Sequence, residues 1–439
     1  MTNTDQQRPT SRPSPFVALR YRDFRLLWLG QIVSQAGTQM TIVAVSWQLY
    51  ELTGSELALG LIGLCRIVPL LLFSLGSGVL ADAFDRRKLM LLSQSTLLVL
   101  AATLALTTNL QLISPALIYG ILVLSSTAST FDLPARQALI PNLVPRAHLS
   151  NALSLNIIAW QTATIIGPSI GGLLIAWRGN TDVVYAVDAL SFGAVLLALL
   201  MMRTRHIAAE RRSVSVAAAL EGLHFVRRTP ILWSTMALDF AATFFAGAMT
   251  LLPVFAKDIL QVGPSGLGML YAAPAVGSVV TGLIMAWIGS VRRQGAIILY
   301  AVALYGLCTA IFGISTSFVL SCLMLAGLGA ADTVSMVIRN TLRQTLTPDE
   351  LRGRMVSVNQ IFFAGGPQLG EIEAGLVAEL LGPSVSVWTG GLGCIAAVAL
   401  VALRVPQLRR YTDSLETEPR AVSAAKPGEV TASDVVQGA

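Results

Sequence analysis

The stretch GSGVLADAFDRRK, from Gly76 to Lys88, joins the end of a long apolar run to a short basic turn. It opens on closely spaced glycines, which let a neighbouring helix pack tightly against this one. Asp82 stands near the end of the apolar run, and three basic residues close the stretch. An apolar run of about 20 residues that ends in basic residues is typical of a membrane-spanning helix whose basic end faces the cytoplasm.

The composition of the whole chain agrees with this interpretation. Hydrophobic residues make up 54% of the 439 residues, and charged residues make up only 12%. A soluble chain usually carries about 25% charged residues. The four cysteines all lie in apolar runs, and no CxxC motif or histidine cluster occurs, so we expect no metal site and no disulfide framework. The sequence therefore predicts an all-α integral membrane protein.

Apolar runs of about 20 residues or more recur along the chain and predict about twelve transmembrane helices. The predicted spans lie near residues 24–50, 57–81, 88–108, 113–137, 148–177, 182–202, 231–255, 265–289, 294–313, 317–341, 352–381 and 384–404.

Positive charge is concentrated in alternate connectors between these spans. The intervening connectors hold only Arg178 and Lys257. Basic residues favour the cytoplasmic side of a membrane, so the alternation predicts that both chain ends lie in the cytoplasm and that the protein spans the inner cell membrane. It also accounts for the net charge of +6 without a nucleic-acid partner.

The two halves of the chain resemble each other at a fixed offset. Residues 203 positions apart match without a gap, and the matches include Arg136 with Arg339, Gly172 with Gly375 and one pair each of Pro, Asn and Ser. Two parallel six-helix repeats are a transporter architecture, with the substrate site between the halves. We expect a cytoplasmic arm (1–22), an N-terminal bundle (23–202), a linker with an interfacial helix (203–230), a C-terminal bundle (231–404) and a disordered cytoplasmic tail (405–439).

The opening stretch resembles the signature loop between the second and third helices of the major facilitator superfamily. The matching residues are Gly78, Asp82, Arg86 and Arg87, whereas Ala83 and Asp85 depart from the family's usual basic residue and glycine. The resemblance implies a conformational lock at the cytoplasmic side, in which the loop carboxylate braces the start of the eleventh helix. To this lock we add Arg354 and the pair Asp132 and Arg136, which the i,i+4 spacing favours as a structural ion pair.

The segment IIGPSIGG, from Ile165 to Gly172, resembles the antiporter signature of the same superfamily through Gly167, Pro168, Gly171 and Gly172. In the family this element marks exporters of drugs and metabolites. A kinked helix that merely packs closely is the alternative. Two further segments, FDLPARQALIP and EGLHFVRRTP, resemble the branch that contains the enterobactin exporter and the macrolide efflux proteins.

Ionisable groups inside predicted spans are candidate functional residues, because a charge near the bilayer centre costs at least about 2.5–3.5 kcal/mol. Glu371 and Glu373 lie two residues apart, so on a helix they point about 200° from each other. We expect Glu371 to face a cavity with Arg66 as its partner, and Glu373 to face a neighbouring helix. Such a pair could carry a proton or could be a static link between the halves. Asp239 and the polar stripe of Gln31, Gln35 and Thr38 are further cavity candidates, with a buried hydrogen-bond seam as the alternative for the stripe. Asp188 is expected to reach toward the outer surface.

The predicted function is proton-coupled efflux of a small molecule by alternating access. No phosphate-binding GxxxxGK[ST] loop occurs, which argues against an ATPase. A membrane-embedded enzyme would need a nucleophile beside a base, or a metal cluster, and the sequence shows neither pattern. We expect no cofactor, a monomer in the lipid bilayer, protons as the coupling ion, and a siderophore-like metabolite or an amphiphilic drug as substrate. A proton-coupled importer and a non-transporting receptor of the same fold are the alternatives.

Overall fold

The computed structural model describes residues 16–83, 85–203, 224, 226–245, 247–289, 293–348 and 352–411. Some side chains near the inner ends of the second and eleventh long helices, within 74–84 and 352–364, lie outside this description. Most of the predicted N-terminal arm, most of the 203–230 linker and most of the C-terminal tail also lie outside the described residues.

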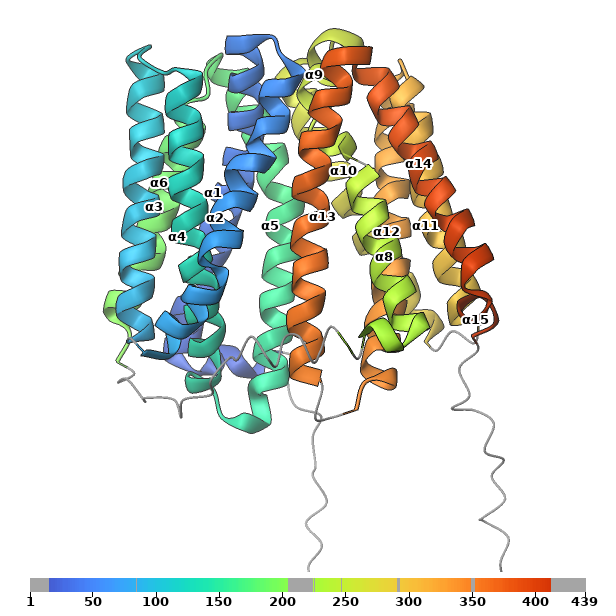
Figure 1. Ribbon diagram of the computed structural model, residues 1–439. Coiled ribbons are helices and arrows are strands. Elements are labelled where there is room, and N and C mark those ends of the chain that lie inside the picture. Colours follow the sequence, from blue (N-terminus) through green and yellow to red (C-terminus); the bar gives the residue numbers. More distant parts are fainter. Residues whose placement is uncertain are drawn as a thin grey trace, which may run out of the picture.

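Twelve long helices form the described part of the chain and run roughly parallel or antiparallel to one another (Figure 1). They are α1 (Arg22–Thr53), α2 (Glu56–Ala83), α3 (Arg86–Asn109), α4 (Pro115–Leu139), α5 (Leu149–Arg178), α6 (Asp182–Met201), α8 (Pro230–Phe245), α10 (Gly263–Ile288), α11 (Gln294–Ile314), α12 (Phe318–Leu346), α13 (Arg352–Leu381) and α14 (Pro383–Arg404). Within the described residues, ten spans are long and apolar enough to cross a membrane. The other two long helices, α1 and α13, are not among these ten. The predicted all-α fold with twelve long helices is confirmed.

Short helical turns stand at the helix ends. They are η1 (Val17–Arg20), η2 (Ile140–Asn142), η3 (Arg146–His148), η4 (Gly247–Met249), α9 (Leu252–Val254), the π-helix η5 (Phe255–Ile259) and α15 (Pro406–Arg410). Because the long helices alternate in direction, η1 and α15 lie at the same end of the bundle. We call this end, which carries the basic connectors, the inner end, and the opposite end the outer end.

The first six long helices pack mainly against one another, and so do the last six. Two helix pairs join these halves: α2 packs along α13, and α5 packs along α10. The repeat relates the two pairs, because α13 is the counterpart of α5 and α10 is the counterpart of α2. The halves therefore meet along two similar seams.

Each seam contains a contact between two glycines. A Cβ atom added to Gly172 on α5 would lie 2.9 Å from the Cα of Gly268 on α10, and one added to Gly375 on α13 would lie 2.7 Å from the Cα of Gly60 on α2. Gly172 and Gly375 are one of the residue pairs that the repeat relates. The absence of a side chain at these four positions is what lets the backbones of the two halves touch.

The seventh span differs from the prediction. The sequence predicts one helix over 231–255, but α8 ends at Phe245 and the chain continues as η4, α9 and the π-helix η5. Two features favour the break. Gly247 packs against the backbone of Gly370 on α13, and Pro253 has no N–H group with which to continue an α-helical ladder. The outer part of this span therefore turns toward α1 and α13.

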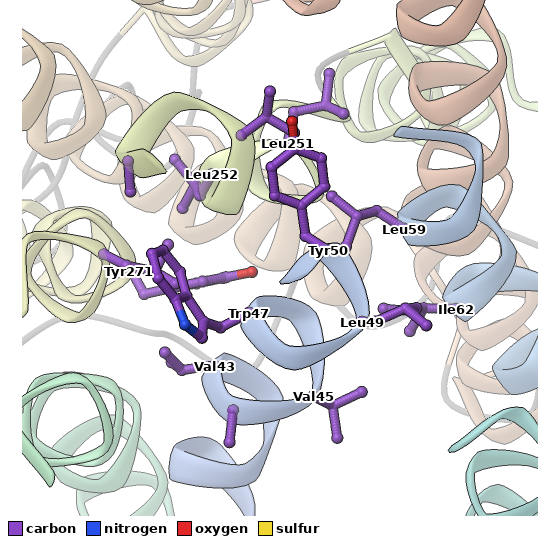
Figure 2. Close-up of a cluster of buried hydrophobic side chains, with 14 of the residues drawn as sticks. Val43, Val45, Trp47, Leu49, Tyr50, Leu59, Ile62, Leu251, Leu252 and Tyr271 are labelled. Atoms are coloured by element: carbon purple, nitrogen blue, oxygen red, sulfur yellow. The ribbon is translucent and has the colours of Figure 1, made fainter. Parts of the chain in front are cut away.

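The largest buried hydrophobic cluster spans both halves near the outer end (Figure 2). Trp47, Leu49 and Tyr50 of α1 pack in this cluster with Leu252 of α9 and Tyr271 of α10. Leu49 and Leu252 are fully buried. This apolar plug covers the outer side of the space between the halves.

Candidate functional site

A cavity of about 200 Å³ lies between the two halves, on the inner side of the hydrophobic plug. Both halves contribute to its walls. The lining residues are Gln39, Ile42 and Ser46 of α1, Leu59, Ile62 and Arg66 of α2, Thr164 and Pro168 of α5, Met249 and Thr250 at and after η4, Tyr271 of α10 and Glu371 of α13.

An ion pair crosses one wall of this cavity. The Nη1 atom of Arg66 on α2 lies 3.5 Å from Oε1 of Glu371 on α13, and the two side chains are 27% and 22% exposed. Gly63, one turn from Arg66, makes room for this approach, because a Cβ atom there would lie 2.7 Å from the Cβ of Glu371. The pair thus links the halves at a point that also faces the cavity.

Two acceptor atoms beside this pair lack a hydrogen-bond partner among the described residues. They are Oε2 of Glu371 and Oε1 of Gln368, and both are shielded from solvent. Glu373 is half-buried and lies on a different face of α13. The helix spacing therefore separates the two glutamates, as the sequence predicts, and only Glu371 lines the cavity.

The segment that resembles the antiporter signature forms the facing wall. Pro168 lines the cavity, and it occupies the repeat position that Glu371 holds in the other half. Gly167 and Gly171 pack against Gln39 and Met40 of α1, and Gly172 packs against α10. Through this segment α5 packs closely against α1 of its own half and against α10 of the other half.

The polar side chains along α1 lie in two different environments, a buried contact with α4 and the wall of the cavity. Gln31 is buried and accepts a hydrogen bond from Arg136 of α4, and Gln35 donates to Gln31 over 3.5 Å. Gln39, two turns farther along the helix, donates to Thr164 over 3.1 Å and lines the cavity. Gln31 thus belongs to a buried hydrogen-bond seam, and the sequence reasoning missed Gln39 as the member of the stripe that reaches the cavity.

Arg136 also faces Asp132, one turn away on α4. Nε of Arg136 lies 3.9 Å from Oδ2 of Asp132, and Gln94 of α3 donates to Oδ1 of Asp132 over 3.0 Å. The i,i+4 spacing produces the ion pair that the sequence predicts. It lies within the first half and does not join the two halves.

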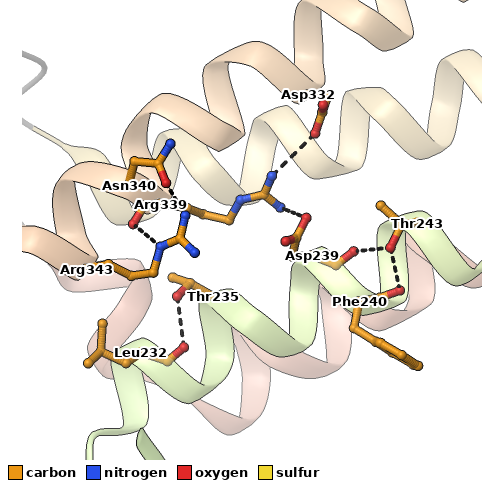
Figure 3. A network of polar contacts seen from close by, with 9 residues as sticks. All are labelled: Leu232, Thr235, Asp239, Phe240, Thr243, Asp332, Arg339, Asn340 and Arg343. Carbon is orange, nitrogen blue, oxygen red and sulfur yellow. Dashed lines mark hydrogen bonds and ion pairs between the residues drawn. The ribbon is translucent and has the colours of Figure 1, made fainter. Parts of the chain in front are cut away.

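The second half contains a related arrangement around Arg339 of α12 (Figure 3). Arg339 Nη1 donates to Asp239 of α8, and Nη2 donates to Asp332 of α12 over 3.3 Å. The side chains of Arg339 and Asp239 are 7% and 11% exposed, whereas that of Asp332 is 46% exposed. The sequence singles out Asp239 as a cavity candidate, but in the structure its carboxylate forms a buried ion pair with Arg339.

Polar contacts between the halves also occur near the outer end. The hydroxyl of Tyr50 on α1 donates to Asp258 of η5, and Nζ of Lys257 lies 5.4 Å from the centre of the Tyr50 ring. Glu379 of α13 accepts hydrogen bonds from Oγ of Ser55 over 2.8 Å and from the backbone N–H of Leu57 over 3.1 Å. These residues hold the outer side of the cavity closed.

The predicted lock residues are described only in part. The side chains of Asp82 and Arg354, and the surroundings of Gly78, lie outside the described residues. The guanidinium of Arg86 donates to the carbonyl of Ala138 over 2.8 Å, and that of Arg87 donates to the carbonyl of Leu200 over 3.1 Å. Both arginines thus tie the loop to its own half.

Two carboxylates differ from their sequence-based interpretation. Asp85, a departure from the family pattern, accepts hydrogen bonds from the backbone N–H groups of Arg87 and Lys88 and so caps the start of α3. Asp188 does not reach the outer surface. It is 3% exposed and accepts a hydrogen bond from Thr41 of α1 over 2.7 Å. Gly37 leaves the space in which this carboxyl group sits.

Comparisons with known proteins agree with this architecture. A family model described as "Transmembrane secretion effector" matches residues 13–430. The multidrug efflux pump Tap of Mycolicibacterium fortuitum is 30% identical over 399 residues, which cover 88% of this chain and 96% of the relative. The enterobactin exporter EntS of Escherichia coli O81 is 26% identical over 413 residues, which cover 94% and 95%.

Solved structures share the fold at low sequence identity. A bacterial homologue of the human lysosomal transporter Spinster, in an inward-facing and unoccupied conformation, aligns with a TM-score of 0.68 at 14% identity and covers 91% of this chain and 97% of its own. The nucleoside transporter NupG aligns with a TM-score of 0.68 at 12% identity and covers 89% and 99%.

Proposed function

The chain belongs to the transmembrane secretion effector family of the major facilitator superfamily, and on that premise we propose that it exports a small molecule in exchange for protons. Its two relatives named above are an efflux pump and an exporter. The chain is a multi-pass membrane transporter rather than an enzyme. Export, the coupling ion and the substrate are the parts that the proposal adds.

The ion pair between Arg66 and Glu371 is the observation that carries the proton coupling. It lies on the seam between α2 and α13, so it breaks if these helices separate. While the outer end is closed, Arg66 stabilises the ionised form of Glu371. When the outer end opens, Glu371 loses its counter-ion, so the stabilisation that Arg66 gives to the ionised form is lost and a proton binds more readily than it would beside Arg66. Each conformation therefore sets a different proton affinity at one carboxyl group.

The direction of exchange follows from this difference. Glu371 takes up a proton from the outer side when α2 and α13 separate, and releases it to the inner side when Arg66 returns. A proton gradient directed inward would then drive the halves through one cycle, with substrate carried outward from the cavity. Pro168, on the facing wall of the cavity, supplies no titratable group, so the coupling resides in one seam only.

The test uses purified protein in proteoliposomes, with ethidium and enterobactin as probes. We expect a pH gradient to drive transport of at least one probe, and Glu371→Gln to abolish this pH-driven transport while exchange of the probe at equal pH continues. Glu373→Gln is the matched control, because it removes a carboxylate two residues away that does not line the cavity. Normal pH-driven transport by Glu371→Gln would remove this residue from the coupling mechanism.

The physiological substrate requires a separate measurement. We expect cells that lack the chain to release less of one intracellular metabolite or added drug than cells that produce it. Comparison of the culture media by mass spectrometry identifies the compound. Accumulation of that compound in the medium of the deletion strain would indicate import instead.

A further inference from the structure

The charges on the lining of the cavity between the halves cancel. Arg66 contributes one positive charge and Glu371 one negative charge, and no other residue of the described lining is charged. These two charges lie on the same wall, since 3.5 Å separates Nη1 of Arg66 from Oε1 of Glu371. A ligand in the cavity therefore meets a dipole and no net charge.

Charged groups farther away leave this balance unchanged. Among the described residues, Arg66 is the only charged group that acts on Glu371. Tyr271, on the wall that α10 contributes, interacts electrostatically with Glu371 and Arg66 and with no other charged group of the described residues. Beyond the hydrophobic plug, Lys257 and Asp258 are neighbours in η5 and carry opposite charges. The ion pair therefore sets the electrostatic character of the cavity.

The ion pair offers a ligand hydrogen-bond donors rather than acceptors. Oε1 of Glu371 faces Arg66, and Oε2 is shielded from solvent, 3.0 Å from the position that a Cβ atom of Gly63 would take. The guanidinium of Arg66 carries several N–H donors, and one of its nitrogens has a hydrogen-bond partner among the described residues. Because the Arg66 side chain lines the cavity and is 27% exposed, its remaining donors are available to a ligand.

We propose that the cavity binds uncharged molecules that carry an acceptor oxygen on an apolar skeleton, such as amides and ketones, and that Arg66 donates to this oxygen. This inference rests on the proposed transport function and narrows its substrate class. An ion attracted by one member of the pair is repelled by the other, so the lining does not compensate the ion for its lost hydration. Ile42, Leu59 and Met249 also line the cavity and suit an apolar skeleton.

The test compares three probes of the same shape but different charge on the full-length protein in lipid nanodiscs. At neutral pH benzamide is uncharged, benzamidinium is a cation and benzoate is an anion. Each is a ring with one planar group, which suits a cavity of about 200 Å³, because a cavity of about 150 Å³ holds benzene. Saturation-transfer NMR titrations, corrected with empty nanodiscs, should show that wild type binds benzamide about tenfold more tightly than either ion, a difference of about 1.4 kcal/mol.

A variant that unbalances the charges should change the order of the probes. Glu371→Gln leaves the positive charge of Arg66 without a partner, so we expect benzoate to bind about tenfold more tightly than it binds to wild type. Glu373→Gln is the matched control, because this half-buried carboxylate does not line the cavity, and it should keep the wild-type order. Unchanged benzoate binding by Glu371→Gln would show that the probes do not bind beside the ion pair and would overturn the proposal.

The wild-type comparison decides the matter even if Glu371→Gln fails to fold. Binding of either ion as tightly as benzamide, or no binding of benzamide, would each overturn the preference for uncharged molecules. The proposed transport function is judged separately, by the pH-driven assay in proteoliposomes. A protein that exports the cation ethidium in that assay keeps its proposed function and loses this substrate class.

Discussion

At the scale of the residue, Arg66 and Glu371 each supply the charge that the other needs inside the membrane. Arg66→Gln leaves Glu371 as an unpaired carboxylate, and breaking a buried pair in this way costs about 3–5 kcal/mol. Both side chains are partly exposed, so we expect the lower end of this range. The double variant Arg66→Gln/Glu371→Gln removes both charges.

The measurement is the apparent melting temperature of the purified variants in detergent. We expect Arg66→Gln to melt lowest and the double variant to melt between it and wild type. A double variant that melts below Arg66→Gln would show that the two side chains do not act as a pair. Such a result would also weaken the coupling mechanism that depends on their contact.

The sequence predicts this ion pair because the energetic cost of an intramembrane charge is local and known. It predicts less about Gln31 and Gln39, which lie eight residues apart on α1 but end in different surroundings. Gln31 meets Arg136, and Gln39 meets the cavity. Which member of a stripe reaches the cavity depends on how neighbouring helices are placed along and around α1. No local pattern in α1 contains that information.

At the scale of the element, the seam between α5 and α10 depends on glycine. A Cβ atom at Gly172 would lie 2.4 Å from the carbonyl oxygen of Pro264, which is closer than van der Waals contact permits. We expect Gly172→Ala to push the two helices apart, to lower stability by about 1–3 kcal/mol and to slow transport. The apparent melting temperature and the initial transport rate of the same preparation test this.

Gly120→Ala is the matched control. Gly120 lies within α4, and a Cβ atom there would meet nothing within 4 Å. Alanine is favoured over glycine in a helix by about 1 kcal/mol, so this variant should be as stable as wild type or more stable. If Gly172→Ala behaves like Gly120→Ala, the seam tolerates a side chain and its glycine contact is not a constraint.

Elements were predictable to different degrees. The long apolar runs predict α3, α6 and α11 closely because nothing interrupts their helical pattern. The break after Phe245 is different, since it depends on the contact of Gly247 with α13, more than 120 residues away in the chain. The sequence contains the glycine and Pro253, but tertiary packing decides that the helix ends there.

At the scale of the whole molecule, the distribution of basic residues predicts which end faces the cytoplasm. Single cysteines replacing Gln111 and Thr316, which are exposed at the outer end, should react with a membrane-impermeant maleimide in intact cells. A cysteine replacing Ala147, exposed at the inner end, should react only after the cells are opened. The four native cysteines are first replaced by serine. Labelling of the Ala147 site in intact cells would reverse the proposed orientation.

The outer closure of the molecule depends on side chains that reach from one half to the other. Glu379 of α13 caps the start of α2, where its carboxylate accepts from Oγ of Ser55 and from the backbone N–H of Leu57. A negative charge is stabilised at a helix N-terminus because unpaired N–H groups point toward it. Outward opening must break this contact, together with the one between Tyr50 and Asp258.

A cross-link between positions 55 and 379 should therefore stop transport. We expect Ser55→Cys/Glu379→Cys, joined by a short bismethanethiosulfonate, to bind substrate from the inner side but to complete no cycle, and a reductant to restore transport. The control is Asn109→Cys/Asp182→Cys. These side chains are joined by a hydrogen bond of 3.0 Å near the same end, but both belong to the first half. Rigid movement of the halves leaves that distance unchanged, so the control cross-link should permit transport. Continued transport with positions 55 and 379 cross-linked would mean that the halves do not separate at their outer end, and alternating access would then require movement inside one half.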